Sequence, residues 1–66
     1  MDEIIQENLL TEAEVAEKLQ LSGQTLRRWR VDGRGPVFVK LNGVVRYRAD
    51  DVDQYIIANR VGGGDE

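Results

Sequence analysis

Two short segments with helical character follow one another in the first half of the chain. The first opens at Thr11 with Glu14 three residues later, a capping box in which each side chain bonds a backbone N–H of the other residue. The second opens at Ser22, a favourable N-cap, and closes at Asp32-Gly33, because glycine suits the left-handed position that ends a helix. Two helices of about nine residues with so short a connection predict a helix-turn-helix.

A β-hairpin is predicted directly after these helices. Asn42-Gly43 stands between the β-prone runs 37–41 and 44–48, and a type I′ turn needs a positive φ at both central residues. With a two-residue turn, Phe38 faces Tyr47 across the hairpin. We expect these two aromatic side chains to point inward.

A third helix is expected after the hairpin. Asp50 is its expected N-cap, and Asp51 and Asp53 in the first turn suit the positive end of the helix. The expected inner stripe of this helix is Val52, Tyr55, Ile56 and Asn59. We expect residues 1–9 to form an N-terminal arm, residues 10–60 a winged helix-turn-helix domain and residues 61–66 a disordered tail. The fold class is therefore mainly α with a β-hairpin.

The core of a 66-residue chain must consist of a few well-placed side chains. The sequence has no cysteine, so neither a disulfide nor a cysteine-bound zinc can add stability. The expected core residues are Val15, Leu19, Leu21, Leu26, Trp29, Phe38, Tyr47, Val52, Tyr55 and Ile56.

The formal net charge of −3 conceals an uneven distribution. Residues 1–20 and 49–66 are mainly acidic, whereas residues 21–48 carry seven basic side chains against one acid, a net charge of +6. A Debye length is about 8–10 Å at physiological salt, so a phosphate senses this basic segment far more than the charge of the whole molecule. The basic middle of the chain is therefore the feature that a function must explain.

The second helix is expected to expose polar and basic side chains opposite its buried stripe. If Leu26 and Trp29 point to the core, Gln24 and Arg28 point away from it. Arginine bonds bidentately to guanine in the major groove and glutamine to adenine, whereas other basic side chains suit phosphates. The candidate DNA contacts here are Ser22, Gln24, Thr25, Arg27, Arg28 and Arg30. Taken alone, these arginines fit a solvated basic face equally well.

Basic side chains also accompany the turn and the hairpin. The candidate contacts there are Arg34, Lys40, Asn42, Gly43, Arg46 and Arg48. A hairpin is narrow enough to approach a minor groove or the phosphate backbone. The alternative is that the hairpin only completes the core.

No pattern of catalytic or metal-binding residues is present. The sequence has no histidine, and its run of aspartates at 50–53 is explained as a helix start without the spacing of a calcium loop. We therefore expect no enzyme, no cofactor or metal and no small-molecule ligand. No apolar run approaches the roughly 20 residues of a membrane span, so a cytoplasmic, DNA-associated protein is expected.

The sequence resembles the MerR-type winged-helix domain in two runs, Leu10-Thr11-x-x-Glu14-Val15-Ala16 and Leu21-Ser22-x-x-Thr25-Leu26-Arg27-Arg28-Trp29. It is similar to the phage excisionase branch of that family in Gly33-Arg34-Gly35-Pro36, Lys40-Leu41-Asn42-Gly43, Val45-Arg46-Tyr47 and Asp50-Asp51-Val52. The resemblance covers residues 9–60.

This resemblance implies a MerR-like winged helix-turn-helix and a recombination directionality factor without enzymatic activity. Such proteins bind repeated sites beside an attachment core, several copies side by side, bend the DNA and help a tyrosine integrase to excise a prophage. By position, the resemblance places contacts at Ser22, Gln24, Thr25, Arg27 and Arg28 and, on the wing, at Lys40, Asn42, Gly43 and Arg46. Trp29 and Tyr47 match core positions of the family.

Two alternatives stay open at this point. The same short domain occurs in small transcriptional regulators, whose sites overlap a promoter. The acidic flanks and the sequence pI near 4.8 also fit a protein-interaction module or an antirepressor.

Overall fold

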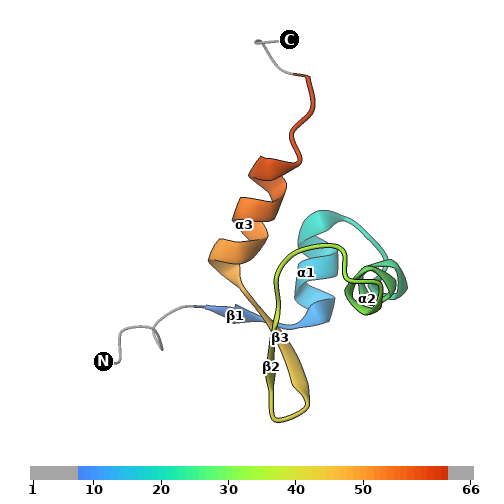
Figure 1. Ribbon diagram of the computed structural model, residues 1–66, viewed down its shortest axis with the longest axis vertical. Coiled ribbons are helices and arrows are strands. Elements are labelled where there is room, and N and C mark those ends of the chain that lie inside the picture. The colour runs from blue at the N-terminus through green and yellow to red at the C-terminus, as the bar shows by residue number, and fades with distance from the viewer. Residues whose placement is uncertain (1–7, 63–66) are drawn as a thin grey trace.

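A computed structural model describes residues 8–62 (Figure 1). Most of the expected arm and tail, residues 1–7 and 63–66, lies outside the described residues. The elements in chain order are β1 (Leu9–Leu10), α1 (Glu12–Leu19), α2 (Gly23–Val31), β2 (Val39–Leu41), β3 (Val44–Arg48) and α3 (Ala49–Ala58). None of the helices in the described part of the chain has the length and apolar character of a membrane span.

The start of α1 and the turn between α1 and α2 follow from local side-chain chemistry. Thr11 and Glu14 form the complete capping box that the sequence predicted, with bonds of 3.1 Å and 2.8 Å. Gln20 ends α1 in the left-handed conformation, with φ of 59°, and the Ser22 hydroxyl caps α2 by accepting the Thr25 N–H at 3.0 Å. These two caps produce the abrupt change of direction between the helices.

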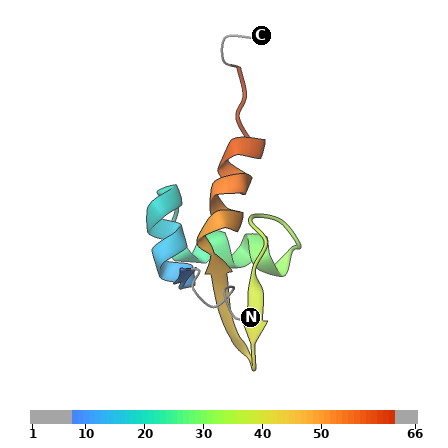
Figure 2. The same cartoon turned by 90° about the vertical axis from the view of Figure 1, so that its left-hand side faces the viewer.

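The hairpin has the predicted register, and it belongs to a larger sheet than expected. Val39 pairs with Arg46 and Leu41 with Val44, and the positive φ of Asn42 (54°) and Gly43 (90°) confirms the predicted turn. Strand β1 adds a third, antiparallel strand on the other edge of β3, giving the order β1-β3-β2. Strand β3 therefore pairs with β1 at the base of the hairpin and with β2 nearer the turn, and the tip projects from the body (Figures 1 and 2).

The expected N-cap of the third helix is wrong. Helix α3 begins at Ala49, and Arg48 occupies the N-cap position without a side-chain cap. The cause is the pairing of β3 with β1, because Leu9 lies opposite Arg48 and the Ala49 N–H donates to the Asn8 carbonyl at 3.1 Å. Asp50 accordingly lies inside the first turn, where its charge still suits the helix dipole.

The core lies where α1, α2, β3 and the start of α3 meet. Its buried side chains are Val15, Ala16, Leu26, Tyr47 and Val52, with Leu10, Leu19, Trp29, Phe38 and Val45 packed against them. The expectation that Ile56 belongs to the core is wrong, since its side chain is 41% exposed. Residues 57–62, which follow it, are also exposed, and α3 extends beyond α1 and the sheet (Figure 1).

Candidate nucleic-acid interface

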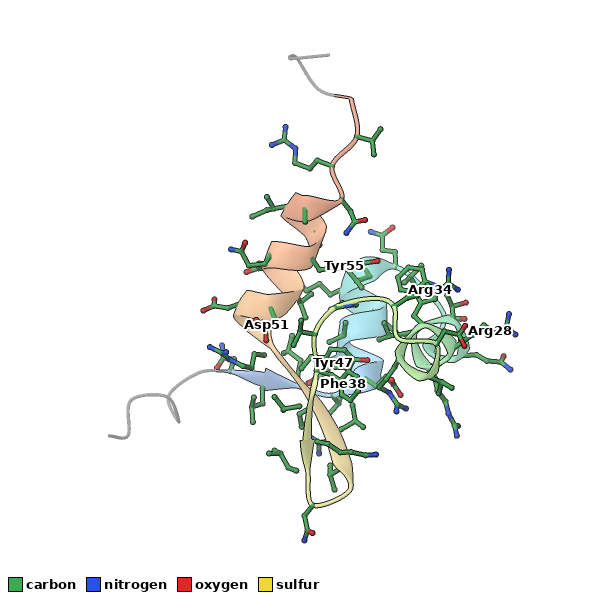
Figure 3. All side chains as sticks on the ribbon, viewed as in Figure 1. Arg28, Arg34, Phe38, Tyr47, Asp51 and Tyr55 are labelled. Atoms are coloured by element: carbon green, nitrogen blue, oxygen red, sulfur yellow. The ribbon has the colours of Figure 1, made fainter. Side chains whose placement is uncertain are left out.

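Helix α2 exposes a polar and basic face. Gln24, Arg27 and Arg28 are exposed, while Leu26 on the other side of the helix is fully buried. Arg28 points away from the body of the molecule (Figure 3). This is the arrangement that the helical periodicity predicts, and it leaves these three side chains accessible to a groove of DNA.

Ser22 and Thr25 form a small hydrogen-bonded unit at the start of α2. The Ser22 hydroxyl donates to Thr25 Oγ1 at 2.9 Å and accepts the Thr25 N–H at 3.0 Å. Both residues therefore have a structural task in the helix cap. Ser22 is exposed and Thr25 half-buried, so the cap lies at the surface where an approaching backbone phosphate would meet the helix start.

Unlike Arg27 and Arg28, Arg30 is partly buried and bonded to another element. Its Nε donates to Glu12 Oε2 at 2.7 Å and its Nη2 to Oε1 at 3.3 Å. The guanidinium carbon lies 5.8 Å from the centre of the Phe38 ring. Hydrogen bonding to Arg30 lowers the pKa of Glu12, and the same bond raises the pKa of Arg30. The structure thus separates Arg30 from the exposed cations Arg27 and Arg28.

Tyr47 shares the carboxylate of Glu12. Its hydroxyl donates to Glu12 Oε2 at 3.2 Å, and its ring lies 6.1 Å from that of Phe38, as the inward orientation of the two aromatics predicted. Burial, followed by the neighbouring Glu12 charge, raises the pKa of Tyr47 to about 12. Sequence reasoning missed this polar cluster. Its partners are 18 and 35 positions apart, and no local pattern signals such a contact.

The connection between α2 and β2 packs closely on Trp29. Gly35 has a φ of +86°, and a Cβ atom there would lie 3.2 Å from Trp29 Cε3. The Arg34 N–H donates to the Trp29 carbonyl at 2.7 Å. These contacts leave the Arg34 side chain at the surface, 62% exposed, with Asp32 at 3.8 Å.

The hairpin carries its polar candidates at different depths. Asn42 and Gly43 form the exposed tip, and Lys40 is exposed beside them. Arg46 is half-buried and its Nη1 donates to the Val45 carbonyl at 2.7 Å. Arg48 lies at the base of the hairpin, opposite β1 and at the start of α3, so the structure does not bring it to the tip with the others.

An apolar pair adjoins the tip of the hairpin. Leu41 and Val44 are cross-strand partners on either side of Asn42-Gly43, and they are 49% and 46% exposed. The predicted two-residue turn makes Leu41 and Val44 a cross-strand pair, and the structure confirms this pairing. Neither residue was among the candidate contacts.

The acidic residues of α3 lie away from the basic face of α2. Asp51 is on the opposite side of the molecule from Arg28 (Figure 3). Asp53 of α3 forms an ion pair with Lys18 of α1 at 3.2 Å. Asp51 is therefore separated from the exposed Arg28, and the charge of Asp53 is paired with that of Lys18.

Residues 9–60 match the family described as "Helix-turn-helix domain", a DNA-binding family that includes excisionase-like proteins. No curated protein has a sequence that matches the chain.

Proposed function

The chain belongs to this helix-turn-helix family, and from that premise we propose that it is an excisionase, which binds and bends attachment-site DNA to direct a tyrosine integrase toward excision. The observation that supports the proposal is the combination of two elements. Helix α2 exposes Gln24, Arg27 and Arg28, and a hairpin with Lys40 at its exposed end projects beside the same body. One element suits a major groove and the other the adjacent minor groove or backbone.

In this proposal the exposed residues of α2 read the DNA sequence. Arg28 and Gln24 contact base edges, and Arg27 and Arg34 contact phosphates on either side. Ser22 and Thr25 present the capped helix start to the backbone. Further candidate contacts are Asn42, Gly43, Lys40, Arg46 and Arg48 on the hairpin and Arg30 on α2. The role of Arg30 is mainly structural, because two of its nitrogen atoms donate hydrogen bonds to the Glu12 carboxylate.

The tip of the hairpin supplies the bend. Proteins that kink DNA from the minor groove place apolar side chains against the base edges and cations against the flanking phosphates. Leu41 and Val44 provide an exposed apolar pair next to Lys40. A single domain of this size has a modest contact area, which favours several copies side by side on repeated sites.

The proposed function acts by binding and not by catalysis, and its partners are DNA, an integrase and further copies of the chain. An excision assay with a tyrosine integrase and its attachment-site DNA tests it. We expect excisive recombination to rise when the protein is added, and footprints of protein and integrase to lie beside one another on the attachment region.

Unchanged excision together with binding at a promoter would instead identify a small transcriptional regulator. Absence of binding to any duplex, or binding that is insensitive to salt, would favour the protein-interaction module or the antirepressor.

A variant at the tip tests the bending step separately. Leu41→Ser together with Val44→Ser should reduce the bend measured by circular-permutation electrophoresis while leaving most of the affinity. Ile57→Ser is the matched control, because Ile57 is also exposed, at 56%, but lies near the end of α3 and belongs neither to α2 nor to the hairpin. Equal bends for the wild type and the tip variant would contradict the role of this pair.

A further inference from the structure

Glu12 stands at the point where three elements of the molecule meet. It is the first residue of α1, and its carboxylate accepts hydrogen bonds from Arg30 of α2 and Tyr47 of β3. The carboxylate is 25% exposed and the Arg30 side chain 19%, so water has limited access to the bond between them. Charge-assisted bonds of this kind are stronger and more directional than those between neutral groups.

The contacts continue from Glu12 into the hairpin and back to α2. Arg30 lies 5.8 Å from the centre of the Phe38 ring, and Phe38 in turn lies 6.1 Å from Tyr47. The four side chains therefore form a closed ring of contacts that joins α1, α2 and the residues at the base of the hairpin. We call this set, Glu12, Arg30, Phe38 and Tyr47, the Glu12 cluster.

The backbone packing gives the Glu12 cluster its importance. Helix α1 packs against both α2 and β3, whereas α2 and the hairpin strands approach each other mainly through their side chains. The orientation of α2 relative to the hairpin therefore depends on α1, on side-chain contacts and on the connection that packs on Trp29. Glu12 is the side chain on α1 that hydrogen-bonds to both of the other elements.

We infer that Glu12 is a positioning residue that holds the hairpin at the place relative to α2 where both can engage one DNA duplex at once. The inference rests on the proposed DNA binding. When the two elements are pre-aligned, the second contact forms without a further ordering cost. When the Glu12 cluster is disrupted, α2 still binds its groove, but the hairpin cations no longer contact phosphates.

Tyr47→Phe is the most selective variant, because it removes the hydroxyl that donates to Glu12 and retains the ring that packs in the core. Glu12→Gln removes the charge and keeps the shape of the side chain. Lys18→Ala is the control, since it removes another ion pair of α1, with Asp53, that touches neither α2 nor the hairpin. Thermal unfolding curves of all variants identify a temperature at which every one of them is folded, and binding is compared at that temperature.

The readout is the salt dependence of binding to a duplex selected from random sequence. Each neutralised phosphate contributes about 0.9 to the slope of log affinity against log salt, so about five contacts predict a slope near −4 to −5. We expect Tyr47→Phe and Glu12→Gln to reduce the slope to about −3, as the loss of two hairpin phosphates would. Lys18→Ala should keep the wild-type slope. A change in folding stability alone would lower the active fraction and leave the slope unchanged.

A double-mutant cycle completes the test. Lys40→Ala with Arg46→Ala removes the two hairpin cations nearest the tip, and in that background Tyr47→Phe should cost less than about twofold in affinity, against about tenfold in the wild type. Additive losses, or a wild-type slope in Tyr47→Phe and Glu12→Gln, would overturn the inference. Absence of salt-dependent binding by the wild type would instead overturn the proposed function, so the two failures are distinguishable.

Discussion

Arg28 and Arg30 are two residues apart on one helix and have opposite environments. Arg28 is exposed and points away from the body, whereas Arg30 is held by Glu12 and lies against Phe38. Two residues along a helix correspond to a rotation of about 200°, so neighbouring arginines necessarily face different sides. The basic run on α2 thus has an exposed arginine at position 28 and a structural arginine, bonded to Glu12, at position 30.

The first prediction concerns the different tasks of Arg28 and Arg46. Arg28→Ala should relax sequence preference, costing about 1–3 kcal/mol on the preferred site and little on unrelated DNA. Arg46→Ala should weaken all duplexes alike if Arg46 contacts phosphates, as proposed, because phosphate contacts do not read the sequence. Competition binding with selected and scrambled duplexes measures both. An equal loss of specificity in the two variants would refute this division.

The second prediction concerns Tyr47 at high pH. Its pKa is raised from 10.0 to about 12 in the folded chain. The Tyr47 hydroxyl therefore ionises at a lower pH in the unfolded chain than in the folded chain. Its contribution to folding stability is complete below pH 10 and disappears as the pH rises toward 12. We expect the free energy of unfolding to fall by about 2–3 kcal/mol over this range from Tyr47 alone.

Urea unfolding at a series of alkaline pH values checks the Tyr47 prediction. Other basic groups titrate in the same range, so the comparison is between the wild type and Tyr47→Phe, which lacks the ionising hydroxyl. The difference between their unfolding free energies should change with pH above 10 and be constant from pH 7 to 9. A difference that is constant throughout would contradict the assignment.

At the scale of elements, the connection from α2 to β2 determines where the hairpin begins. Gly33 and Gly35 both have positive φ, but only at Gly35 would a Cβ meet a neighbour, at 3.2 Å from Trp29. Gly33→Ala should cost about 1–2 kcal/mol from backbone strain alone. Gly35→Ala should cost about 2–4 kcal/mol, since overpacking against Trp29 adds to the same strain.

Chemical denaturation of the two alanine variants measures this difference directly. Gly23→Ala is a useful reference, because Gly23 lies in α2 without positive φ and with open space around it. That change should be neutral or stabilising, as alanine favours a helix by about 1 kcal/mol over glycine. Equal losses at Gly33 and Gly35 would show that the contact with Trp29 is not decisive.

The elements that depend on neighbouring residues were predictable from the sequence. Thr11 and Glu14 are three residues apart, and Asn42-Gly43 contains its own turn chemistry, so both could be read locally. The start of α3 could not, because its position depends on β1 pairing with Arg48 across the sheet. The polar cluster at Glu12 was missed for the same reason, since its partners are distant in the chain.

Ile56 illustrates a different limit of sequence reasoning. Its spacing from Val52 is that of a buried stripe, yet its side chain is 41% exposed. Periodicity states which residues share a face of a helix, but not how far the neighbouring elements extend along it. Helix α3 extends beyond α1 and the sheet, so only its first turns lie next to these elements (Figure 1).

At the scale of the whole molecule, the arrangement of charge matters more than its total. The chain has a formal charge of −3, but Asp51 on α3 and Arg28 on α2 lie on opposite sides. Glu12 is neutralised locally by Arg30. The exposed face of α2 therefore carries mainly positive charge, and Asp53 of α3 pairs with Lys18.

Footprinting with dimethyl sulfate on a selected duplex tests most directly whether α2 and the hairpin bind neighbouring grooves. The reagent methylates guanine N7 in the major groove and adenine N3 in the minor groove, so one experiment reports both. We predict protection of guanine N7 over one stretch and of adenine N3 immediately beside it, with Lys40→Ala and Arg46→Ala together removing only the second. Protection confined to one groove, or unchanged in this variant, would contradict the account.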